Sequence, residues 1–334
     1  MYAQQNGVTS ICAHVALRSV LSLLLPEGDI SYGEINRFAG REPTDVNGLA
    51  VEQIRKVISQ CYVKSRCNDK NPIQTGGKQD RDSFSPLLYG YVESGCPALL
   101  SFGVKKAGIG HIVPVLGHTF NESTWVAEAR NGYFDDCDYY SSEGWLGTYL
   151  IHDDNFGPYQ SIPRGFIKQN QFWNLFGLHY AGAALWSDRA ELDALEIFKR
   201  YVAKHRHVSI EDSCFWFDCF SSFCKEQQLV LRSVFIQRSE YIDFLHRWQL
   251  EDSAVNRLDQ SLPETFWMIE VSCPELFPAT RGKFGEMLLT YENANENSGG
   301  TTKLLALRLP GVVAFADGTA VRTKIKSYTP LFSK

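Results

Sequence analysis

An apolar helical segment near the start of the chain constrains the fold more than any other feature. Residues 11–24, ICAHVALRSVLSLL, are apolar on nearly every side of a helix. A helix that is apolar all round is buried in a core rather than laid on a surface. Pro26 and Gly28 follow it and are typical of a helix end. The fold therefore has to be built around this helix.

More helices are expected after this first one. Ser31 and Glu34 have the spacing of a capping box, and they predict a second helix that ends at Gly40. Asn47 is placed to cap a third helix over residues 48–61. A polar stretch, residues 66–83, contains a Gly-Gly pair and predicts a surface loop. A short helix is then expected over 84–94.

Strand patterns begin at about residue 96. Runs rich in β-branched and apolar residues predict strands at 96–102, 111–118 and 149–152. Residues 125–128 look like the returning arm of a hairpin, and the aromatic and acidic stretch 130–148 looks like an inserted loop. Helices followed by an antiparallel sheet indicate an α+β fold.

The pattern starts again beyond residue 175. Helices are expected at 190–205 and 214–226, and strands at 177–185, 229–236, 265–271, 286–292 and 303–309. With 334 residues, the chain is long enough for two domains. We expect a catalytic domain over 1–185 and a closely packed α+β domain over 186–334, in which no catalytic motif is evident.

Composition excludes several classes of partner. The net charge is −5 and the basic residues are scattered, which does not suit nucleic acid or an anionic membrane. No apolar run approaches the roughly 20 residues that span a bilayer, and no secretion signal is evident. Nine cysteines, an odd number without a disulfide framework, favour a reducing, cytoplasmic compartment.

No metal or cofactor is expected either. Cys214, Cys219 and Cys224 are spaced five residues apart. On a helix, each step of five turns the side chain by about 140°, so the three thiols would not converge on one ion.

Cys12 is the candidate nucleophile of the first half. A cysteine in the first turn of a helix lies at the positive end of the helix dipole, which favours the reactive thiolate. Acyl transfer by cysteine also needs a base, a group that orients the base, and donors for the oxyanion. His111 is the candidate base and Asp153 the orienting acid, in the order Cys, His, acid. Gln5 and the backbone N–H of Cys12 are the candidate oxyanion donors.

The residues around these positions resemble papain-like cysteine peptidases. A glutamine followed by Cys12-Ala-His-Val-Ala on a buried helix is similar to the start of that family, most of all the bacterial members that process double-glycine leader peptides. The runs 93–100, 110–117 and 151–157 resemble the family's Gly-x-Pro strand, histidine strand and acid-containing strand end. The resemblance covers about residues 1–165. It implies the papain-like fold, a peptide or protein substrate, no cofactor, and the same roles for Cys12, His111, Asp153 and Gln5.

Spacing leaves alternatives for two of these roles. Gln4 and Asn6 also lie close enough before Cys12 to donate to an oxyanion. Asp153 follows His111 by 42 residues, whereas Glu128 follows it by 17. Either residues 130–148 are an insertion or Glu128 orients the base, and Asp154 is a further alternative within the same turn as Asp153.

Other histidines are expected to be structural. His14 points about 200° away from Cys12 around a helix. His118 lies seven residues along a strand from His111, so it should face the other side of the sheet. His152 alternates away from Asp153.

Three functions fit these residues. The first is a cysteine peptidase that cleaves peptide or isopeptide bonds through a thioester acyl-enzyme. The second is an amidase or acyltransferase on the same scaffold, because the acceptor is chosen by the cleft rather than by the triad. The third is a catalytically silent papain-like protein that binds or scaffolds partners.

Overall fold

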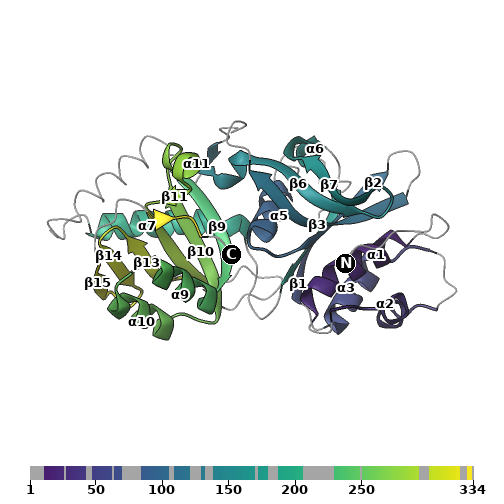
Figure 1. Cartoon of the computed structure of the whole chain (residues 1–334), viewed down its shortest axis with the longest axis horizontal. Coiled ribbons are helices and arrows are strands. Elements are labelled where there is room, and N and C mark those ends of the chain that lie inside the picture. The colour runs from purple at the N-terminus through teal and green to yellow at the C-terminus, as the bar shows by residue number, and fades with distance from the viewer. Residues whose placement is uncertain are drawn as a thin grey trace. The chain divides into compact units, whose positions relative to one another are not determined.

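The computed structural model describes residues 11–25, 28–42, 47–61, 64–69, 84–104, 109–120, 129–131, 138–169, 172–179, 187–205, 229–248, 250–292, 301–323 and 329–332. These residues form helices and mainly antiparallel sheets of the α+β class (Figure 1). The chain divides into two compact units, Met1–Asn121 with Leu146–Leu185 and Glu122–Trp145 with Trp186–Lys334. The expected domains 1–185 and 186–334 differ from these units in one segment, Glu122–Trp145, which groups with the second unit.

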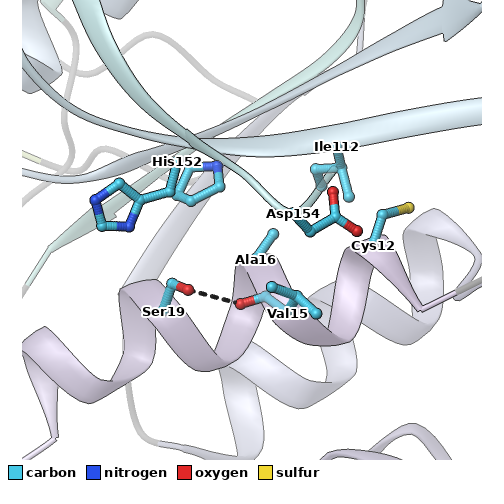
Figure 2. A pocket seen from close by; sticks show the side chains of 8 residues that line it. Cys12, Val15, Ala16, Ser19, Ile112, His152 and Asp154 are labelled. Carbon is cyan, nitrogen blue, oxygen red and sulfur yellow. Dashed lines mark hydrogen bonds between the residues drawn. The ribbon is translucent and has the colours of Figure 1, made fainter. Parts of the chain in front are cut away.

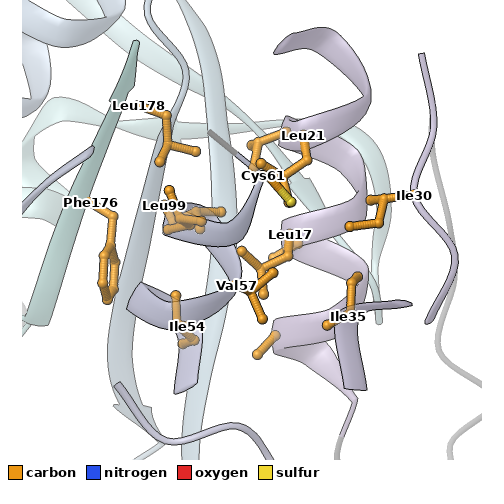
Figure 3. Close-up of a cluster of buried hydrophobic side chains, with 14 of the residues drawn as sticks. Leu17, Leu21, Ile30, Ile35, Ile54, Val57, Cys61, Leu99, Phe176 and Leu178 are labelled. Carbon is orange, nitrogen blue, oxygen red and sulfur yellow. The ribbon is translucent and has the colours of Figure 1, made fainter. Parts of the chain in front are cut away.

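Three helices form the first part of the first unit: α1 (Cys12–Leu24), α2 (Tyr32–Ala39) and α3 (Val51–Gln60). The buried helix predicted over 11–24 is confirmed, since Leu17, Val20 and Leu21 of α1 have no exposed surface. Figure 3 shows Leu17 and Leu21 facing apolar side chains from α2, α3 and the sheet. Burying a leucine or valine side chain contributes about 1.5–3 kcal/mol, so this helix anchors the unit.

The capping box of α2 is confirmed. The Ser31 hydroxyl accepts from the Glu34 N–H at 3.2 Å, and the Glu34 carboxylate accepts from the Ser31 N–H at 2.9 Å. Gly40 ends the helix with φ +72°, in the left-handed region that glycine tolerates. The cap predicted at Asn47 was wrong, because α3 begins after Ala50. The side chain of Gln53 accepts from the Ala50 N–H at 3.0 Å and fixes the start there.

The first unit contains a six-stranded antiparallel sheet. Its order is β1 (Lys64–Asp69), β8 (Phe172–His179), β2 (Ala98–Val104), β3 (Ile109–Phe120), β6 (Leu146–Asp153) and β7 (Gly157–Pro163). Helices α5 (Phe84–Glu93) and α6 (Arg164–Gln169) belong to the same unit. Because α1 packs on β3, and β3 pairs with β6, residues far apart in sequence meet where these three elements adjoin.

Three local predictions need correction in this sheet. Residues 66–69 of the expected loop belong to strand β1, and residues 70–83 lie outside the described residues. The strand expected at 177–185 is β8, which begins five residues earlier, at Phe172. The hairpin arm expected at 125–128 also lies outside the described residues, and β3 pairs with β2 and β6.

The second unit has an eight-stranded sheet, and its last two strands come from the segment Glu122–Trp145. Its order is β15 (Ala320–Arg322), β14 (Val312–Phe315), β13 (Thr301–Leu309), β12 (Gly285–Glu292), β10 (Thr265–Ser272), β9 (Val230–Gln237), β5 (Asp138–Ser141) and β4 (Ala129–Asn131). A separate pair joins β11 (Gly282–Lys283) to β16 (Thr329–Pro330). The strands predicted at 229–236, 265–271, 286–292 and 303–309 are confirmed.

Helices of the second unit are α7 (Ser187–His205), α9 (Arg238–Arg247), α10 (Asp252–Ser261) and α11 (Leu276–Thr280), with a 3₁₀ turn at Ser142–Trp145. Helices α9 and α10 lie on one face of the sheet (Figure 1). Phe244 and Leu258 of these helices pack with Phe266 and Leu288 of the strands. The helix predicted at 214–226 lies outside the described residues. Among the helices that the structure describes, none is both long and apolar enough to cross a bilayer.

Candidate active site

Cys12 is the first residue of α1, so its side chain lies at the helix N-terminus. The Cys12 thiol is free and half-buried. The positive end of the helix dipole stabilises negative charge at this position. The sequence forms a helix here because the apolar residues after Cys12 pack into the core of the first unit and fix the first turn.

His111 lies on β3 beside Cys12. Its Nε2 is 3.2 Å from Oδ2 of Asp153, and the thiol of Cys12 lies close enough to the ring to help raise the pKa of His111. The ring of Phe102, the register partner of His111 on β2, meets the imidazole edge to face at 5.4 Å. These contacts hold the imidazole between the thiol and the carboxylate.

The charge state of His111 follows from the same contacts. Burial lowers its pKa, but the hydrogen bonds to Asp153 and Cys12 and the negative charges of Asp153 and Asp154 outweigh burial and raise the pKa to about 10. The imidazole is therefore protonated at neutral pH. A protonated imidazole beside a thiol is the partner that a thiolate needs.

Asp153 ends β6 in a tight turn. Its Oδ1 accepts from the backbone N–H groups of Asn155, at 2.8 Å, and Phe156, at 3.2 Å, which leaves Oδ2 to face His111. Burial raises the pKa of Asp153, but the hydrogen bonds from His111 and from the two amides outweigh it and lower the pKa. Gly157 closes the turn with φ +117°. The turn therefore holds a charged carboxylate in a fixed position against the imidazole.

Asp154 supplies a second carboxylate to the same imidazole. Its Oδ1 is 3.6 Å from Nε2 of His111. Its Oδ2 is buried and has no hydrogen-bond partner within the described ranges. Burial is the main cause that raises the pKa of Asp154, in contrast to the lowered pKa of its neighbour. The two aspartates therefore differ in proton affinity, although they are adjacent in the chain.

A small pocket adjoins these groups. It is lined by one face of α1, by β3, and by the end of β6 with the turn after it: Cys12, Val15, Ala16, Ser19, Ile112, Pro114, His152 and Asp154. Figure 2 shows the carboxyl group of Asp154 directed toward the start of α1, near Cys12. The hydroxyl of Ser19 donates to the carbonyl of Val15 at 2.9 Å within the helix. The pocket is thus apolar apart from the groups at its Cys12 end and His152.

His111, Asp153 and Asp154 together have the donor atoms that a metal ion would need. One ligand atom each from His111, Asp153 and Asp154 lies within 4.8 Å of the others. Hydrogen bonds already account for this arrangement, because Nε2 of His111 contacts Oδ2 of Asp153.

Several predicted residues lie outside the described residues. Gln4, Gln5 and Asn6 precede the first described position, and Glu128 falls between two described ranges. The oxyanion donor therefore stays a prediction, as does the alternative role of Glu128. Cys214, Cys219 and Cys224 also lie outside the described residues.

The other histidines make separate contacts. His14 is buried, as predicted, and its Nε2 lies 2.8 Å from the amide oxygen of Asn36. Burial lowers the pKa of His14, so it is neutral in the core. Nε2 of His118 contacts the carboxyl group of Glu93 on α5. His152 packs its ring edge to face against Tyr159 at 4.8 Å, and burial lowers its pKa.

The aromatic residues of the expected inserted loop pack in the second unit. Tyr139 and Trp145 are both 2% exposed, and the ring of Trp145 lies 4.8 Å from that of Phe277. These two side chains form part of a core. Tyr133 and Phe134 lie outside the described residues.

Comparisons with known proteins give only weak likenesses. No protein-family model and no curated protein matches the chain. One solved structure that resembles it is the peptidase domain of Streptococcus ComA, a bi-functional ABC transporter of a quorum-sensing pathway. It has 11% sequence identity and a TM-score of 0.34, and the match covers 54% of this chain and 97% of that domain. A likeness this weak assigns no function.

Proposed function

We propose that this protein is a cysteine-dependent acyl-transfer enzyme with a papain-like fold, and that it hydrolyses peptide or isopeptide bonds. Cys12 is the nucleophile, His111 the acid–base group and Asp153 the orienting acid. One observation carries the proposal: His111 is held between the thiol of Cys12 at a helix N-terminus and the charged carboxylate of Asp153. All three residues belong to the first unit.

The chemistry would proceed in two steps. Sγ of Cys12, as a thiolate, attacks the substrate carbonyl carbon, and the carbonyl oxygen becomes an oxyanion. His111 gives its proton to the leaving amine as the carbon–nitrogen bond breaks, which leaves a thioester on Cys12. Water then attacks the thioester, with neutral His111 as the base, and releases the carboxylic acid and the thiolate.

Each supporting residue has a physical task in this scheme. Asp153 holds the ring orientation of His111 and stabilises the imidazolium, as the acid of a catalytic triad does. The backbone N–H of Cys12, at the start of α1, is placed to donate to the oxyanion. Gln5 is the proposed second donor, with Gln4 and Asn6 as alternatives. The cytoplasm is the proposed compartment, because reduced cysteines favour it.

Alkylation of the thiol tests this proposal without a known substrate. At pH 6, less than about 1% of an ordinary thiol is ionised, because its pKa is about 8.5. We therefore expect iodoacetamide at pH 6 to label Cys12 at least tenfold faster than Cys96, a half-buried cysteine of the same unit. The variant His111→Ala should lose this difference, and His118→Ala should keep it. Equal labelling of Cys12 and Cys96 in the unmodified protein would reject the catalytic assignment.

The acyl acceptor distinguishes hydrolysis from transfer to an amine. p-Nitrophenyl acetate would load an acetyl group on Cys12 and release nitrophenol. Continued release in buffer alone supports a hydrolase. Release that stops after one turnover and resumes only when glycinamide is added supports an acyltransferase instead. The variant Cys12→Ala is the control and should release nitrophenol at the rate of buffer.

A further inference from the structure

Four neighbouring strands of the second unit each contribute one charged residue to a buried row. They are Arg232 of β9, Glu270 of β10, Glu286 of β12 and Arg308 of β13. Register pairs join Arg232 to Glu270, Glu270 to Glu286 and Glu286 to Arg308, so the four side chains lie side by side across the sheet. All are less than 10% exposed. Each lies beside apolar residues in its strand, and this is the signal that the sequence offers for the row.

Lys283 completes this charged row from β11. Its ammonium group has no exposed surface, forms ion pairs with Glu270 and Glu286, and lies 4.8 Å from the centre of the Phe244 ring. Burial raises the pKa of Glu286, but the cations of Arg308 and Lys283 outweigh burial and hold that pKa far below its usual range. The row therefore keeps its charges inside the unit, where desolvation makes them costly unless they are fully paired.

The charged row lies on the face of the sheet that α9 and α10 cover. Phe266, Met268 and Glu270 are spaced two residues apart along β10, so their side chains share one face of the sheet. Phe266 and Met268 pack in the apolar cluster with those helices. The face therefore has an apolar half beneath the helices and a charged row beside it.

The segment Thr329–Phe332 lies over the charged row. The backbone N–H of Phe332 donates to Oε1 of Glu270 at 2.7 Å, and its carbonyl accepts from Nη1 of Arg232 at 3.0 Å. The Phe332 ring is 3% exposed and meets the Phe244 ring edge to face at 5.4 Å. Just before it, β16 pairs with Gly282 and Lys283 of β11. Charged side chains thus hold the backbone of this segment, and an aromatic socket holds its ring.

The large sheet does not include this segment. In the described part of the chain, β16 pairs with β11 over two residues and forms no rung of the eight-stranded sheet. The contacts to Glu270 and Arg232 use backbone atoms that almost any residue offers, whereas the socket selects a large ring. Strand addition combined with a side-chain pocket is a general mode of peptide recognition.

We propose that this face of the second unit is a binding groove for an extended peptide segment with an aromatic side chain, and that Thr329–Phe332 occupies the groove as an internal ligand. A partner peptide adds to β11 as a strand, places one peptide group between Glu270 and Arg232, and inserts its ring against Phe244. The proposal does not depend on the chemistry of Cys12. It gives the second unit a role in holding a peptide.

Competition between the internal segment and a free peptide tests this proposal. The probe is a fluorescent synthetic peptide with the sequence of residues 327–334, SYTPLFSK, and fluorescence anisotropy measures its binding to the full-length protein. The variant Phe332→Ala empties the socket and should bind the peptide at least about tenfold more tightly than the unmodified protein. A tethered segment competes at an effective concentration in the millimolar range. A probe in which alanine replaces the phenylalanine should not bind.

A matched variant controls for a general loss of packing. Phe315→Ala removes the same side chain from the same apolar cluster, but Phe315 lies on β14, which carries no residue of the charged row and does not pair with β16. It should not gain affinity for the peptide. Equal affinity of the Phe315→Ala and Phe332→Ala proteins, or no binding to a folded Phe332→Ala protein, would overturn the proposal.

Hydrogen exchange in the unmodified protein keeps the proposal testable even if Phe332→Ala does not fold. An internal ligand detaches without unfolding of the sheet, so the amide of Phe332 should exchange at least about 100-fold faster than that of Ile269 in β10. Exchange of both amides at the same rate would show that the segment opens only with the whole unit, and it would reject a ligand role.

Discussion

Nε2 of His111 lies 3.2 Å from Oδ2 of Asp153, although the two residues are 42 positions apart in the chain. The sheet explains this distance, because His111 is on β3, Asp153 is on β6, and these strands are neighbours. The intervening segment Glu122–Trp145 groups with the second unit. A long sequence separation therefore does not argue against the pairing.

Asp153→Asn should slow the reaction of Cys12 more than Glu128→Gln does. Asparagine has a similar shape but no charge, so it no longer stabilises the protonated ring of His111. We expect iodoacetamide labelling of Cys12 at pH 6 to fall at least about tenfold in Asp153→Asn. In Glu128→Gln it should stay within about twofold of the unmodified protein. The reverse order would assign the orienting role to Glu128.

The two aspartates should affect the pKa of His111 unequally. Asp153 forms a hydrogen bond with the ring, whereas Asp154 acts through its charge. Both Asp153→Asn and Asp154→Asn should lower the His111 pKa from about 10, and Asp153→Asn should lower it more. Titration of the imidazole by NMR, assigned by comparison with His111→Gln, measures both changes. A larger decrease in Asp154→Asn would make Asp154 the main partner.

Protonation of His111 should stabilise the folded protein over a defined pH range. Its pKa is raised from 6.5 to about 10 on folding, so the folded state holds this proton more tightly than the unfolded state. The stabilisation is complete below about pH 6.5 and is lost as the pH rises through about 10. Urea unfolding between pH 6 and 10.5 should show this loss. His111→Gln should show a smaller pH dependence, and an unchanged dependence would contradict the prediction.

Gly177 of β8 should not tolerate a side chain. A Cβ atom at this position would overlap the ring of Tyr91, which is fully buried on α5. We expect Gly177→Ala to lower the free energy of unfolding by about 1–3 kcal/mol, as overpacked core substitutions do. Gly33→Ala is the matched control, because a Cβ there meets only Ser31 Oγ at 3.9 Å. Urea unfolding compares the two, and equal stability of both variants would contradict the packing argument.

Local signals in the sequence predicted much of the first unit. The apolar pattern of 11–24 and the Ser31–Glu34 pair act within a few residues, so α1 and the cap of α2 follow from sequence. The start of α3 was missed because the side chain of Gln53 provides the cap, which is a weaker pattern than Asn47. The positions of Cys12, His111 and Asp153 in sequence predicted candidate roles, and the structure brings His111 into contact with Asp153 and close to Cys12.

Tertiary contacts decided what the sequence could not predict. The different proton affinities of Asp153 and Asp154 depend on which carboxylate receives the backbone N–H groups of the turn. The charged row of the second unit forms only when four strands pair in register. The sequence of a single strand does not indicate which strands it pairs with. The grouping of Glu122–Trp145 with the second unit depends on the parallel pairing of β5 with β9, which is a contact between distant segments.

That grouping has a consequence for how the chain can be divided into fragments. The chain passes between the two units three times, near residues 121, 145 and 185. A break after residue 185 would leave β4 and β5 joined to the first unit and would strip β9 of a neighbour. Fragment 1–185 would keep all six strands of its own sheet, whereas fragment 186–334 would lack β4 and β5. No single break in the chain therefore separates the two units intact.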